Sequence, residues 1–521
     1  MDAFDNLHSP WIRFGIPILG SMFAAAAVIF LLQSANPLAA SCQLATFFMV
    51  QAAIVSPRAG IFLLLLLCGY SDMVKRLLVV FGSMSLDQVS NVLMAAPAVV
   101  VGLLISIVTR RAFHQTQLRR GDIVFGIVAA VLAGANFLTT MKAGGLFLEA
   151  AKAAVNHGVY AAAAMVALRL VENEERLERF MRMAMIVFIP VALYGLAQLY
   201  FGFAKFEVDY LRSGLSIELK QLDEIRPRPF STLNSAGVLG TLCAGFAVLA
   251  LYPKMAARYR PLRAGESFGS IVVAVIFFAG AVGSLVRAAH IVWIVALVGL
   301  YCFRTRRGTW MFYGAVVAGF VAILLSADFL LEHLPDFDPA QFGTSGYSQA
   351  TLTILTYSDR LKGFINLTSS PEMYSLFGLD ETKVMTEWTY NHDPISTILI
   401  EHGVVGLLIV GIGVVATLVW FHRRLLRMPK GRARTLAVLL VSVLMGWLVS
   451  ELLVKAVITT FPVNAFFWLF VGALVRLVML GEARAGEPAV DAPVAPRVPL
   501  RSGRIRATPR GNSPGTPVRP R

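Results

Sequence analysis

Apolar segments of nearly membrane-spanning length recur along most of this chain, and they restrict it to one class of fold. Hydrophobic residues make up 57% of the 521 residues, and charged residues make up 15%. The segments approach the roughly 20 residues that a helix needs to cross a bilayer. They cover about residues 12–32, 37–54, 90–109, 122–140, 152–171, 182–202, 233–252, 268–283, 288–303, 309–327, 395–421, 435–455 and 461–480. Because hydrocarbon leaves backbone polar groups without water, we expect an all-α polytopic membrane bundle of 12–14 spans.

A shorter apolar run, 59–70, leaves the exact number of spans open. It is followed directly by Asp72, Lys75 and Arg76. Either a further membrane-spanning helix or a partly buried hairpin fits this pattern.

The net charge of +15 reflects membrane topology rather than binding of nucleic acid. Basic residues gather in alternate short loops, as they do in cytoplasmic loops, and the main groups lie at about residues 110–120, 169–182, 254–263, 304–307 and 423–434. We expect the connections 203–231 and 328–393 to face the other side. The longer connection holds ten acidic residues against three Lys or Arg.

The sequence divides into one helical domain, 1–481, and a tail, 482–521. The tail holds eight prolines and eight arginines against three acidic residues, without a periodic apolar pattern. Such a composition predicts a disordered cytoplasmic segment.

Neither a cofactor nor a metal is expected. The four cysteines lie in or beside apolar segments, which gives no disulfide framework or metal box. The sequence contains no glycine-rich nucleotide loop, which argues against direct use of ATP or NAD. Any chemistry should therefore occur where unusual polar residues gather at the outward-facing surface.

The first such group surrounds His392, where the acidic connection meets a new apolar segment. Asp393 can cap a helix whose first residue is Pro394, so we expect that helix to begin beside His392. The positive end of the helix disfavours imidazolium and attracts anions, which suits a neutral histidine base near a phosphate. Glu401, two turns further along with His402, is expected either to be a buried partner or proton path, or to form a structural pair.

Two further groups contain arginine on the outward-facing side. Arg226 and Arg228 precede a run of hydroxyl and amide side chains that includes Asn234, and Arg287 lies in a short turn between two apolar segments. Guanidinium groups suit a diphosphate because they offer planar forks of donors that stay charged.

Taken in the order of the chain, these three groups resemble the pattern of the bacterial O-antigen ligase and polymerase-related family of membrane glycosyltransferases. The run 391–406 is similar to the carboxy-terminal signature of the family, a His with an adjacent Asn followed by Glu-x-Gly-x-x-Gly. The run 228–234 is similar to its arginine-containing helix start, and Val286-Arg287 falls where many members carry Ser-Arg. The resemblance is broadest over about residues 190–425.

This chain departs from the family pattern at two points. Asn391 precedes His392, whereas the order His-Asn is commoner, and Val286 replaces the usual Ser. Asp393 could supply the orienting contact that Asn gives elsewhere.

The resemblance implies an all-α fold of the GT-C class in the bacterial inner membrane, with its active site facing the periplasm. It implies metal-independent transfer of a glycan from undecaprenyl diphosphate to an acceptor glycan or lipid. His392 would be the base, with Arg226, Arg228 and Arg287 binding the diphosphate. Asn391, Asp393, Asn234 and Glu401 would support them. Polymerisation of exopolysaccharide or O-antigen repeat units is slightly favoured over ligation.

Two other classes of function remain open from the sequence. A transporter of lipid-linked oligosaccharides could use the same arginines without any chemistry, and a noncatalytic partner of other polysaccharide-assembly proteins would need no base.

Overall fold

The computed structural model describes residues 26, 34, 36–114, 120–142, 144–213, 228–259, 265–326, 329, 332, 365, 370–378, 394–453 and 460–486. These residues form a helical bundle without a strand, which confirms the all-α expectation. Nine helices in this part of the chain are long and apolar enough to cross a membrane, and the protein is a multi-pass membrane protein. They are α2 (Pro37–Val55), α6 (Arg120–Lys142), α7 (Phe147–Leu170), α8 (Glu174–Phe201), α10 (Ala236–Leu249) with its short continuation α11 (Tyr252–Ala256), α12 (Glu266–Gly283), α18 (Pro394–Arg427), α19 (Arg432–Leu453) and α20 (Val463–Gly486).

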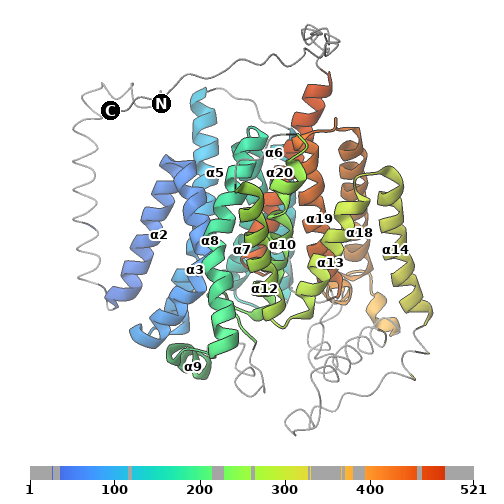
Figure 1. Ribbon diagram of the computed structural model, residues 1–521. Coiled ribbons are helices and arrows are strands. Elements are labelled where there is room, and N and C mark those ends of the chain that lie inside the picture. Colours follow the sequence, from blue (N-terminus) through green and yellow to red (C-terminus); the bar gives the residue numbers. More distant parts are fainter. Residues whose placement is uncertain are drawn as a thin grey trace, which may run out of the picture.

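The other described elements lie among these helices, at the outer edge of the bundle or at one of its ends (Figure 1). They are α3 (Pro57–Gly82), α4 (Leu86–Leu93), α5 (Ala95–His114), α9 (Lys205–Arg212), α13 (Arg287–Cys302), α14 (Arg306–Leu325) and the 3-10 turn η3 (Pro371–Tyr374). Most helix bounds lie within a few residues of the apolar segments. Of the first predicted span, 12–32, the structure describes Ala26 alone.

The structure adds detail to two expectations about the organisation of the chain. The run 59–70 lies within α3, a continuous helix of 26 residues, so the hairpin alternative is wrong and the run belongs to a further long helix of the bundle. At the other end of the chain, α20 continues past Gly481 to Gly486, into the segment assigned to the tail.

Local sequence signals explain where several helices begin. The Asn36 side chain accepts hydrogen bonds from the backbone N–H groups of Leu38 and Ala39, and Pro37 is the first residue of α2. Ser56 and Pro57 repeat the arrangement at the start of α3. Such caps satisfy N–H groups that have no partner inside the helix, and proline is well suited to the first helical position.

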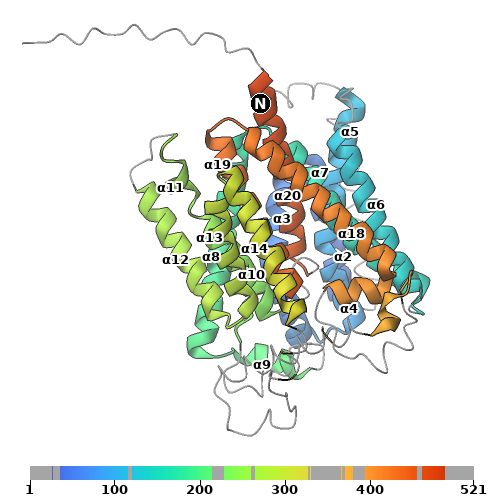
Figure 2. The ribbon, with the colours of Figure 1, turned by 90° about the vertical axis from the view of Figure 1, so that its right-hand side faces the viewer.

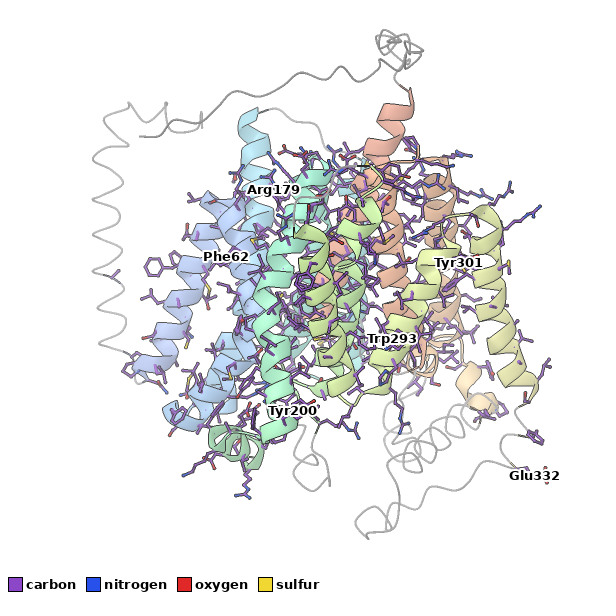
Figure 3. All side chains as sticks on the ribbon, in the orientation of Figure 1. Phe62, Arg179, Tyr200, Trp293, Tyr301 and Glu332 are labelled. Carbon is purple, nitrogen blue, oxygen red and sulfur yellow. The ribbon has the colours of Figure 1, made fainter. Side chains whose placement is uncertain are left out.

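The bundle has two chemically different ends. Arg179 and Tyr200 mark them on α8 (Figure 3). The end near Arg179 is called the arginine-rich end below. It includes the connections α7–α8, α13–α14 and α18–α19, which hold the basic groups at about residues 169–182, 304–307 and 423–434. The opposite end includes α9 and the starts of α10, α13 and α18 (Figures 1 and 2).

Helix α10 lies at the centre of the core. Nearly every residue of α10 is buried. Phe246 packs against Phe188 of α8, Phe277 of α12 and Phe466 of α20, with ring centroids 5.1–5.3 Å apart. The indole N–H of the buried Trp447 in α19 donates to a backbone carbonyl of α10 at 3.2 Å. Because α10 packs against α8, α12, α13, α19 and α20, the position of its first turn is fixed by the whole core.

Candidate functional site

A buried arginine on α3 holds the segment 228–235 at the end opposite the arginine-rich end. Arg76 is 1% exposed. Its Nη1 donates to the carbonyl oxygen of Ser231 at 2.6 Å, and its Nη2 donates to that of Leu233. The guanidinium also lies 4.2 Å from the ring centroid of Phe230. A charge taken out of water needs such partners, because each unmade hydrogen bond to it is costly.

Glu207 of α9 and Gln198 of α8 complete this network. A carboxylate oxygen of the fully buried Glu207 lies 3.5 Å from Nη1 of Arg76 and accepts a hydrogen bond from Nε2 of Gln198 at 2.5 Å. The Oε1 atom of Gln198 accepts from the backbone N–H groups of Phe230 and Ser231, at 3.1 and 2.6 Å. Burial raises the pKa of the Glu207 carboxyl, and the Arg76 charge opposes this rise.

Two hydroxyl groups attach the same segment to the helices on either side. Ser231 Oγ donates to the carbonyl of Val191 in α8 at 2.5 Å, and Thr232 Oγ1 donates to the carbonyl of Gly69 in α3 at 2.6 Å. The backbone of Ser231 is left-handed, with φ of 56°. The run of hydroxyl side chains therefore fixes the backbone in place, and Arg228 sits, exposed, just before this fixed segment.

Asn234 lies where the fixed segment becomes α10. Its Oδ1 atom is buried and has no hydrogen-bond partner among the described residues. The neighbouring Ser235 caps α10 by accepting a hydrogen bond from the N–H of Val238 at 3.3 Å. A buried acceptor without a partner is costly and calls for an explanation such as a bound donor. The amide oxygen of Asn234 is thus a buried acceptor without a described donor, beside the first turn of α10.

The turn that carries Arg287 touches α10 directly. Gly240 of α10 faces the fully buried Ser284, so that a side chain at Gly240 would collide with the Ser284 hydroxyl and would approach Ala289 to 2.9 Å. Leu285 has a left-handed φ of 56°, and Arg287 is the first residue of α13. The structure therefore brings the elements of Arg228, Asn234 and Arg287 together at one end of the bundle.

The predicted group around His392 lies mostly outside the described residues. The structure does not describe Arg226, Asn391, His392 or Asp393. It does place the first residue of α18 at Pro394, as the sequence predicted. Helix α18 begins at the same end of the bundle as α10 and α13 (Figure 2).

Helix α18 does not run unbroken through the apolar segment 395–421. Gly403 has a φ of 67°, which interrupts the helix. The N–H groups of Val404 and Val405 start the second half of α18, and they donate to the carbonyls of Ser375 and Leu376 at 3.0 and 3.2 Å. The first glycine of the Gly-x-x-Gly pattern therefore makes a break at which α18 is joined to the segment after η3.

The prediction that Glu401 is a buried partner is wrong. Its side chain is 41% exposed, and one of its oxygens lies 3.8 Å from Nε2 of His402. This separation is too long for a hydrogen bond. Glu401 precedes the break at Gly403, where α18 contacts the segment after η3. Near Arg287, His290 is hydrogen-bonded within its own helix, since its Nδ1 accepts from the indole N–H of Trp293 at 3.2 Å.

Three residues of this site, Arg76, Gln198 and Glu207, were not predicted from the sequence. A signal for Arg76 was present, because an ionisable residue inside an apolar helix usually marks a functional or structural site. No local pattern pairs it with a segment 155 residues away. Among the described residues, no group of three or more His, Cys, Asp or Glu could hold a metal ion.

Comparison with known proteins found no matching family model, curated protein or solved structure.

Proposed function

We propose that this protein is a membrane glycosyltransferase of the GT-C class. It would transfer a glycan from an undecaprenyl-diphosphate carrier to an acceptor hydroxyl at the periplasmic face of the bacterial inner membrane. Its favoured reaction is the polymerisation of exopolysaccharide or O-antigen repeat units, and ligation to a lipid A-core acceptor is the alternative. The observation that carries the proposal is a contact at the end opposite the arginine-rich end. There α10, which follows the segment of Arg228, packs against the turn that leads into α13 and Arg287.

The chemistry of the donor explains why arginines would be needed at this position. A diphosphate is a good leaving group, so the protein has to stabilise the negative charge that develops on it and to remove a proton from the acceptor. Arg228 and Arg287 supply the positive charge, with Arg226 beside them. The positive ends of α10 and α13 add to their field, because both helices begin here.

His392 is the proposed base, with Asn391 and Asp393 as its neighbours. Attack by the acceptor from the face opposite the leaving diphosphate inverts the anomeric carbon. The buried Oδ1 of Asn234 would accept a hydroxyl hydrogen of a bound sugar, which would orient the donor before transfer.

Substitution of the three central residues tests this function. We expect His392→Ala, Arg228→Ala and Arg287→Ala each to lower glycan transfer by at least about 100-fold at equal expression. Arg212→Ala is a matched control, because Arg212 is exposed on α9 at the same end of the bundle. Near-normal transfer in all three variants would refute the proposed site.

The assay should follow the lipid-linked glycan itself in vesicles that contain the purified protein. A longer glycan on the carrier identifies a polymerase, and a glycan on a new lipid identifies a ligase. Movement of unchanged lipid-linked glycan across the bilayer, without either product, would instead identify a transporter.

A further inference from the structure

A cationic cavity lies at the arginine-rich end, far along the helices from the proposed glycosyltransferase site. It is formed where the chain leaves α11, turns between α13 and α14, and turns between α18 and α19, and four of its lining residues are Arg258, Arg304, Lys430 and Arg434. Its volume is about 180 Å³, well above the roughly 10–15 Å³ that one water needs. None of its described lining residues is acidic.

Several other basic residues at this end have carboxylate partners. Arg176 is paired with Glu172, Arg424 with Glu482, and Arg432 with Glu178. Within the described part of the chain, the four side chains that line the cavity have no carboxylate partner. Their charges repel one another, and an anion in the cavity would remove that repulsion.

Arg434 is already held in position to receive such an anion. Its Nη1 donates to the carbonyl of Met428 at 3.1 Å and its Nη2 to the carbonyl of Arg304 at 3.2 Å. These two bonds tie the α18–α19 turn to the α13–α14 turn. A guanidinium has five N–H donors, so the two fixed bonds orient the group and leave further donors for a phosphate.

The walls of the cavity favour a lipid over a free ion. Met255 and Val438 provide non-polar surface beside the cations. The cavity also lies at the ends of membrane-spanning helices, which is the depth of phospholipid headgroups. Basic pockets between such helices on the cytoplasmic side bind anionic headgroups.

We propose that this cavity binds the phosphate headgroup of one anionic phospholipid from the adjacent leaflet. The phosphate lies among Arg258, Arg304, Lys430 and Arg434, and the glycerol and the first carbons of the acyl chains contact Met255 and Val438. The site goes beyond the proposed function, because it requires no glycan and lies at the other end of the bundle.

A lipid titration followed by native mass spectrometry tests the proposal. The full chain in neutral detergent is titrated with phosphatidylglycerol, with phosphatidylcholine of the same acyl chains, and with glycerol phosphate. We expect one phosphatidylglycerol to bind at concentrations at which neither of the other two binds. In Arg304→Gln/Lys430→Gln its affinity should fall about 10-fold to 30-fold, because each cation near the membrane surface contributes separately.

Arg306→Gln/Arg307→Gln is the matched control, since it removes the same charge from exposed residues of the adjacent helix start that do not line the cavity. Its affinity for phosphatidylglycerol should change by less than about twofold. Equal losses in both double variants would overturn the proposal, because they would show that diffuse surface charge attracts the lipid. Equal binding of phosphatidylcholine, or of glycerol phosphate, would overturn it as well.

Discussion

Replacing Arg76 by methionine should show how strongly the segment 228–235 depends on one guanidinium. Methionine fills a similar volume but cannot donate a hydrogen bond. The carbonyls of Ser231 and Leu233 would lose their donor, and the buried carboxyl of Glu207 would lose its cation. Removing one partner of a buried ion pair costs about 3–5 kcal/mol. We expect the free energy of unfolding of Arg76→Met to fall by about this amount.

The measurement is an SDS titration of the purified protein in mixed micelles, with two comparison variants. Arg58→Met removes an exposed arginine from the same helix and should change stability by less than about 0.5 kcal/mol. Arg76→Met/Glu207→Gln removes the unpaired charge as well and should be about 1–3 kcal/mol more stable than Arg76→Met alone. The reasoning fails if Arg76→Met unfolds at the same SDS concentration as Arg58→Met.

Three further outcomes follow from the same structure. Burial raises the pKa of Glu207 in the folded state above its value in the unfolded chain, so the folded state binds more protons between these two pKa values and stability is lost as pH rises through that interval. In Arg76→Met the opposing charge is gone, so the loss of unfolding free energy should be larger at pH 8 than at pH 5. An equal loss at both pH values would contradict this. Gly403 has a positive φ, and a side chain there would collide with the backbone of Leu376 and Gly378, so Gly403→Ala should expose the segment 370–378 to protease. The control is Gly411→Ala in the same helix, where no atom lies within 4 Å of an added Cβ, and it should leave the cleavage rate unchanged. Gly240→Ala should lower stability by about 1–3 kcal/mol through overpacking against Ser284, and Gly240→Ala/Ser284→Ala should recover part of the loss in the same SDS titration.

Hydropathy and capping residues predicted the individual helices well. Each predicted span from residue 37 onward corresponds to a described helix, and α18 begins at Pro394, where the sequence has a proline suited to the first turn. These features depend on neighbouring residues, which is why a single sequence reveals them. Arg228, Asn234 and Arg287 were singled out for the same reason, because each stands at the start of an apolar segment.

Features that depend on distant residues could not be predicted in the same way. The charge of Arg76 made the end of α3 look unlike a span, because its partners in α9 and in the segment 228–235 are far along the chain, whereas Asp72 and Lys75 pair with each other within α3. Likewise, Gly403 is one of several glycines in α18, and its left-handed conformation becomes necessary through its contact with the segment after η3. The basic cavity also combines three separate turns, each of which alone resembles an ordinary cytoplasmic loop.

The contact between Arg76 and Ser231 also sets an order for the biogenesis of the protein. The ribosome makes Arg76 155 residues before Ser231, so α3 enters the membrane while the carbonyl partners of its guanidinium do not yet exist. An arginine without partners is expelled toward the water interface. Helix α3 can therefore reach its final depth only after α8, α9 and the chain up to Leu233 have been made. The closing of this end of the bundle is then a late event, separate from the insertion of the first helices.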